Sequence, residues 1–273
     1  MNHVMIINMQ VPNQFKPPIL ICQLCLREPR LLKSHILPRA YFRKITRNSS
    51  GKAISFDDSP ETKVGFSSSQ WVQELMCGAC EQKISQYESS AIETLRTFRG
   101  KFAKTGDQRL CLESHHCRLF FTSLVWRSAI ATIDEFQKVC LPPEIREVAR
   151  RSLFSGTPLS RQVLTCTLRI VIDKSGGFND ASLRDIMITP IPRTTRIPYS
   201  FLFLIDGMLL EFFCPGLTET RELDADGVVT GRRLMTVPTV DIFEVPEVVR
   251  ILVSGYGKNL EGKLSDAVKT RAR

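Results

Sequence analysis

Two Cys-x-x-Cys pairs, Cys22/Cys25 and Cys77/Cys80, constrain this chain more than any other feature of its sequence. A two-residue spacer lets both sulfurs of a pair face one ion, and four thiolates make a closed tetrahedral zinc site. One pair alone is weak evidence, because thiols at this spacing also serve redox chemistry. Two pairs with 51 residues between them predict a zinc ion that staples distant segments. The alternative is a set of unliganded thiols in the core.

The remaining cysteines and the overall composition fit a folded protein with reduced thiols. Nine cysteines is an odd number, which suits a metal site better than a disulfide framework. The chain is 43% hydrophobic and 24% charged, and no run approaches the roughly eighteen apolar residues of a membrane helix. Its first residues lack the pattern of a signal peptide, so we expect a cytoplasmic protein without membrane contact. The unpaired cysteines are expected to be buried: Cys111, Cys117, Cys140, Cys166 and Cys214.

Positive charge is concentrated next to the first cysteine pair. The chain carries a net charge of +9, and residues 27–52 contain eight Lys or Arg against one acid, Glu28. Phosphate backbones attract such a stretch, so we expect a polyanion partner, namely nucleic acid. The alternative is an ordinary solvated surface.

The hydrophobic pattern predicts mainly helices in the first half of the chain. A short helix is expected over 38–46, with a proline at its first position. Polar residues 48–70 read as a loop with short strands at 53–56 and 63–66. From Cys80 onward, apolar residues recur at three- and four-residue steps, which predicts a helix to about Phe98 that ends near Gly100.

The second half changes from helical to β patterning. We expect a mostly buried helix in HHCRLFFTSLVWRSAIATIDEF and another after Pro142-Pro143. Strands follow in VLTCTLRIVI and near 233–243, a hairpin turns at Asp206-Gly207, and a helix follows Pro246. The predicted fold class is α+β: a zinc-stapled domain over 1–110, then a helical segment and an antiparallel-sheet region over 111–273.

The sequence SHILPRAYFRK around His35 resembles the "DHI-x-P" element of HNH endonucleases, the zinc-knuckle branch of the ββα-metal nucleases. In that family one CxxC precedes the histidine motif, and a second opens the helix that carries a final metal ligand. The same order is present here, and the resemblance covers roughly residues 20–90. The segment FFTSLVWRSAI (120–130) also resembles one that follows such domains in bacterial proteins, but no chemistry can be assigned to it.

This resemblance implies metal-assisted hydrolysis of phosphodiester bonds. His35 would take a proton from the attacking water. Glu81 would help to hold a catalytic Mg²⁺ or Mn²⁺, distinct from the zinc because four thiolates leave no open position. If the 38–46 helix forms, Arg39, Arg43 and Lys44 would face phosphate.

The sequence departs from the family pattern at two of its ligand positions. Ser34 stands where the family usually has an acid, and Glu81 stands where it usually has histidine or asparagine. A middle asparagine is not evident; the nearest polar candidates are Gln73 and Glu74, and Glu88 lies two helical turns beyond Glu81. His35 can alternatively be a residue of a zinc fold that only binds. Glu81 can be an ordinary first-turn glutamate favoured by the helix dipole.

Three functions therefore follow from the sequence. The leading hypothesis is a metal-dependent endonuclease acting on DNA, in phage defence or a mobile element. The second is a non-catalytic zinc-binding module that holds nucleic acid or a protein. The third is a structural interaction protein whose zinc replaces a core. Residues 111–273 contain no nucleotide-binding or hydrolase motif, and we expect them to serve recognition, oligomerisation or partner binding.

Overall fold

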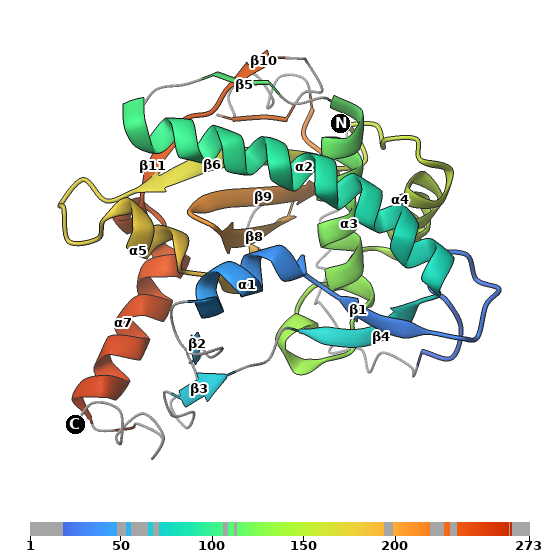
Figure 1. The fold of residues 1–273 in the computed structure, drawn as a ribbon, viewed down its shortest axis with the longest axis horizontal. Coiled ribbons are helices and arrows are strands. Elements are labelled where there is room, and N and C mark those ends of the chain that lie inside the picture. Colours follow the sequence, from blue (N-terminus) through green and yellow to red (C-terminus); the bar gives the residue numbers. More distant parts are fainter. Residues whose placement is uncertain are drawn as a thin grey trace, which may run out of the picture.

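The computed structural model describes residues 19–47, 53–55, 65–67, 71–105, 109–111, 114–193, 199–218, 227–229, 234–261 and 263 of the 273-residue chain. Residues 1–18, most of the predicted loop over 48–70, and most residues after 261 lie outside this description. Helices and strands are mixed along the chain, which confirms the predicted α+β class (Figure 1). Within the described residues, no helix combines the length and apolarity that a membrane span requires.

The N-terminal part is built around a two-stranded antiparallel ladder that leads into a long helix. Strand β1 (Leu32–His35) pairs with β4 (Val72–Met76), and β4 runs directly into α2 (Gly78–Thr105). The segment between the strands contains α1 (Arg39–Arg47) and the paired strands β2 (Ala53–Ser55) and β3 (Gly65–Ser67), all close to their predicted positions. Strand β1 was not predicted, because LKSH has no β pattern and becomes a strand only by pairing with β4.

Helix α2 is longer than the sequence predicted. Its periodic apolar residues are buried as expected, but the helix continues through Gly100 to Thr105. Phe102 extends the buried stripe one turn beyond Phe98, and the two rings lie 6.0 Å apart. Burial of this extra turn outweighs the weak helix propensity of glycine.

Two further helices pack beside α2. Helix α3 (Ser114–Ile130) is almost entirely buried, as its apolar sequence predicted, and it crosses α2 in Figure 1. The short helix η1 (Asp134–Phe136) follows it, and then α4 (Pro143–Ser155). Helix α4 begins at the predicted proline and ends at Gly156, whose φ of +77° forms a left-handed C-cap.

The C-terminal part is a five-stranded sheet in the order β11-β6-β9-β8-β7. Neighbours are antiparallel except for the parallel pair β11–β6. The hairpin at Asp206-Gly207 is confirmed, and both turn residues have positive φ, as a tight two-residue turn requires. The strand bounds are β6 (Thr165–Ile172), β7 (Ile188–Arg193), β8 (Tyr199–Ile205), β9 (Met208–Cys214) and β11 (Thr239–Asp241).

Three elements of this part differ from the prediction. The single strand expected near 233–243 is two strands, because β10 (Leu234–Thr236) pairs with β5 (Arg109–Cys111) and only β11 joins the large sheet. Strand β7 was missed because it contains two prolines, which a sheet accepts at its edge. Helix α5 (Asp180–Arg184) is too short for a periodic signal.

The sheet is covered on both faces. One face packs against α2 and α3 in a hydrophobic cluster that contains, for example, Leu95, Phe120 and Phe212. The other face packs under α5, η2 (Ile242–Glu244) and α7 (Pro246–Leu260). The first cluster draws residues from both sides of the predicted boundary at 110/111, so the two predicted regions share one core.

Candidate metal centre and histidine site

The four predicted zinc ligands lie together in space. The sulfurs of Cys22, Cys25, Cys77 and Cys80 are all within 4.8 Å of one another, and the Cys25 and Cys77 sulfurs are 4.0 Å apart. Tetrahedral zinc with Zn–S bonds of about 2.3 Å separates its sulfurs by about 3.8 Å, so this arrangement fits a single ion. In the described part of the chain, no other group of three or more Cys, His, Asp or Glu ligands comes this close.

Local backbone structure places the two pairs. The first pair is held in a turn in which the Leu26 amide donates to the Cys22 carbonyl at 2.8 Å, and Leu26 adopts a φ of +58°. The second pair spans the end of β4 and the first turn of α2. The amide of Gln23 donates to the Leu75 carbonyl at 3.0 Å, which joins the two segments beside the cysteines.

Electrostatics at the cluster also suit a metal. Burial opposes ionisation of Cys25, but hydrogen bonds from the Glu28 and Arg27 amides outweigh it and lower the pKa of Cys25 to about 7. Burial raises the pKa of Cys22 and of Cys80, so those thiols need a cation to ionise. Arg150 on α4 donates to the Leu24 carbonyl at 2.6 Å. Its hydrogen bond to Glu147, helped by the nearby Cys25 thiolate, raises the pKa of Arg150.

The predicted catalytic residues lie at the junction of β1 and α2. Ser34, fully buried, donates its hydroxyl to the Glu81 carboxylate in the first turn of α2. Burial raises the pKa of Glu81, while the Ser34 hydrogen bond and the charges of Arg127 and His35 oppose this change. His35 is half-buried at the end of β1. The structure thus brings His35, Ser34 and Glu81 into one neighbourhood.

A buried arginine that the sequence analysis missed completes this neighbourhood. Arg127 of α3 donates from Nη1 to the His35 carbonyl at 2.6 Å and from Nη2 to the Glu88 carboxylate. Its side chain is only 2% exposed. The available signal was an arginine within the mostly apolar run LFFTSLVWRSAI, because a buried charge requires partners.

The other polar candidates are not part of this group. Gln73 is paired with Thr132, donating to its hydroxyl at 2.6 Å and accepting from its amide at 2.8 Å. Glu74 is exposed. Within the described ranges only the cysteines form a cluster of three or more metal-binding groups, so His35 and Glu81 are not joined by a third such ligand.

The predicted phosphate-binding residues on α1 divide into two kinds. Arg39 and Arg43 are exposed. Lys44 instead forms an ion pair with Asp206 in the β8–β9 turn, whose side chain is only 3% exposed. The sequence did not indicate this contact between α1 and the large sheet.

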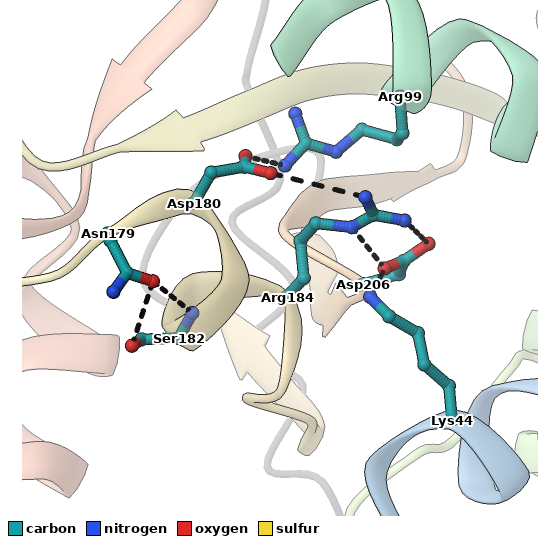
Figure 2. A network of polar contacts seen from close by, with 7 residues as sticks. All are labelled: Lys44, Arg99, Asn179, Asp180, Ser182, Arg184 and Asp206. Atoms are coloured by element: carbon teal, nitrogen blue, oxygen red, sulfur yellow. Dashed lines mark hydrogen bonds and ion pairs between the residues drawn. The ribbon is translucent and has the colours of Figure 1, made fainter.

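Asp206 belongs to a wider charge network, drawn in Figure 2. Its carboxylate also accepts from Arg184 Nε at 2.8 Å, and Arg184 Nη1 lies 4.0 Å from Asp180 Oδ2. Asp180 in turn accepts from Arg99 of α2 at 2.6 Å. The network therefore connects α1, α2, α5 and the β8–β9 turn.

Replacing Cys77 by serine should abolish metal binding and most of the N-terminal structure, because three thiolates hold zinc poorly and the fold depends on the ion. Metal analysis should find about one zinc per chain in the wild type and in the control Cys140→Ser, a cysteine outside the cluster. Full zinc retention in Cys77→Ser would contradict the ligand assignment.

Asp206→Asn should destabilise the protein by about 1–3 kcal/mol, because Lys44 and Arg184 lose a buried partner but keep partial access to water. Asparagine tolerates the positive φ of this turn, so the hairpin itself should persist. Urea unfolding measures the change. The control Glu244→Gln removes an exposed pair with Lys174 and should have almost no effect; equal losses in the two variants would contradict the network's role.

Comparison with known proteins adds no assignment to this geometry: no family model matches the chain, and no curated protein or solved structure matches it either. Any function assigned to this protein therefore depends on the residues of the site itself.

Proposed function

We propose that this protein is a metal-dependent endonuclease of the HNH type that hydrolyses phosphodiester bonds in DNA. The observation that carries the proposal is the path of the chain through β1, β4 and α2. The two strands are antiparallel, and β4 runs into α2. One cysteine pair precedes β1 in the chain, and the other follows β4. The pairing of β1 with β4 ahead of α2 supports the strand–strand–helix element that the resemblance around His35 implies, with α1, β2 and β3 lying between the two strands in the chain.

The residues at this junction can share the work of hydrolysis. A neutral His35 imidazole would accept the proton of the attacking water. Glu81 is the carboxylate that would hold Mg²⁺ or Mn²⁺, an ion that neutralises charge on the scissile phosphate when bound. Magnesium sites commonly use one or two carboxylates and take their other ligands from water and substrate phosphate. The small number of protein ligands here is compatible with that kind of site.

Positive charge close to His35 in the sequence supports a nucleic-acid substrate. Arg39 and Arg43 follow His35 by four and eight residues and are exposed on α1. Positive side chains of this kind bind phosphates without reading base sequence. The neighbouring Lys44 forms an ion pair with Asp206. We therefore assign phosphate contact to the two arginines in preference to Lys44.

A second function is favoured by one specific observation. Both carboxylates near His35 already have partners, since Glu81 accepts from Ser34 and Glu88 from Arg127. A protein that binds nucleic acid or a partner without cleaving it needs no carboxylate left open for a metal ion. The alternative proposal is therefore a non-catalytic zinc-binding module that holds nucleic acid or a protein partner.

Incubation of supercoiled plasmid with the protein and Mg²⁺ or Mn²⁺ separates these functions. Wild type should nick or linearise DNA, and His35→Ala and Glu81→Gln should each lose at least about 100-fold in rate. His115→Ala is the matched control, because His115 is exposed at the start of α3, where it hydrogen-bonds to the Gly156 carbonyl and lies edge-on to the His116 ring. DNA that is shifted in a gel but never cut would favour the binding module. If the protein neither cuts nor shifts DNA, an interaction protein is favoured.

Arg39→Gln combined with Arg43→Gln should weaken DNA binding similarly for all sequences. The slope of log affinity against log salt should fall by about 2, because two phosphate contacts are lost. Fluorescence anisotropy at several salt concentrations measures this slope. The control Arg151→Gln removes an exposed arginine on α4; an equal effect of this control would show that binding depends on net charge and not on α1.

A further inference from the structure

Arg127 is the one charged side chain in residues 119–130 of α3, a stretch in which every side chain is buried. Only 2% of the side chain is exposed, and α3 carries it into the core between α2 and β1. Removing a guanidinium from water is costly unless hydrogen bonds and an opposite charge replace the lost hydration. The replacements come largely from the N-terminal part of the chain, namely His35 and Glu88, together with the Ser123 carbonyl at 3.3 Å.

The contact with His35 is made at the point where β1 ends. The guanidinium binds the carbonyl oxygen of His35 at 2.6 Å, and the next amide, that of Ile36, donates to the Trp71 carbonyl at 2.9 Å. The peptide that follows His35 is therefore fixed on both sides. A hydrogen bond from a charged donor is stronger than a neutral one, so this carbonyl is held firmly.

The contact with Glu88 holds the second half of the site. Glu88 lies two turns beyond Glu81 on α2, and its carboxylate pairs with the same guanidinium that binds His35. The positive charge also acts on Glu81, where it favours the ionised carboxylate. One side chain thus connects the strand that carries the proposed base with the helix that carries the proposed metal ligand.

We infer that Arg127 is a positioning residue of the proposed nuclease site, and that the region after residue 110 therefore helps to fix the geometry of that site. This inference rests on the proposed function. It assigns a role to the segment FFTSLVWRSAI, whose sequence alone suggested no chemistry. A displacement of about 1 Å at a reacting group can cost on the order of 100-fold in rate, so fixing His35 against α2 matters for the chemical step.

The test compares Arg127→Met and Arg127→Lys with Arg193→Met. Arg193 is a matched control, because it is also largely buried and also holds two carboxylates, Glu211 and Glu247, but on the sheet face under α7. Arg127→Met should lower kcat by about 100-fold. KM for DNA and zinc content should stay close to wild type. Arg193→Met should lower the melting temperature but leave kcat unchanged.

Arg127→Lys and one further variant, Glu88→Gln, keep the test decisive if Arg127→Met does not fold. Arg127→Lys keeps the charge but cannot hold both partners, so its kcat should lie between those of Arg127→Met and wild type. Glu88→Gln should also lower kcat. Where Arg127→Met folds, adding Glu88→Gln to it should cost little more, because both changes remove one shared contact. Unchanged kcat in all three variants would overturn the inference, as would an equal kcat loss in Arg193→Met.

A measurement that does not need cleavage separates this inference from the proposed function. The chain has four histidines, so the ring signal of His35 can be identified by NMR as the one lost in His35→Ala. Arg127→Met should shift or broaden that signal and leave those of His115 and His116 in place. An unchanged His35 signal would overturn the positioning role even if wild type cleaves DNA. If wild type does not cleave but the His35 signal moves, the nuclease proposal fails and the structural link from Arg127 to His35 stands.

Discussion

The four-cysteine cluster is the constraint on which the N-terminal structure depends. It joins a turn near the start of the described chain to the point where β4 becomes α2. Strand β1 lies between these two attachment points, and among the described residues its one partner strand is β4. A two-stranded ladder is marginal by itself in water. A metal ion bound by the four sulfurs would supply the missing stability, and it would hold His35 on β1 near Glu81 on α2.

Buried charges then connect this scaffold to the rest of the molecule. Arg150 reaches the first cysteine turn from α4, Arg127 reaches His35 and Glu88 from α3, and Asp206 reaches Lys44 from the large sheet. Each of these groups is costly to bury without its partner. The later part of the chain therefore does more than cover an apolar face, because it sets the positions of the basic helix and of the histidine strand.

Much of the fold was predictable because local patterns agree with it. The buried stripe of α2, the proline and glycine that bound α4, and the Asp206-Gly207 turn are each encoded within a few residues. Strands β1 and β7 were missed because their sequences are poor β formers, and they exist only through pairing with β4 and β8. The extension of α2 past Gly100 was missed for a similar reason, since it depends on burial of Phe102.

The sequence by itself identified the four candidate metal ligands and the candidate histidine, because spacing and residue type suffice to single them out. Only the tertiary structure decided which charges meet. Glu81 accepts a hydrogen bond from Ser34, Lys44 is taken up by Asp206, and Arg127 lies between His35 and Glu88. All of these contacts join residues at least 39 positions apart in the chain, and a linear pattern carries no signal for them. Ion pairs inside a core are set by which elements pack together, and packing involves the whole chain at once.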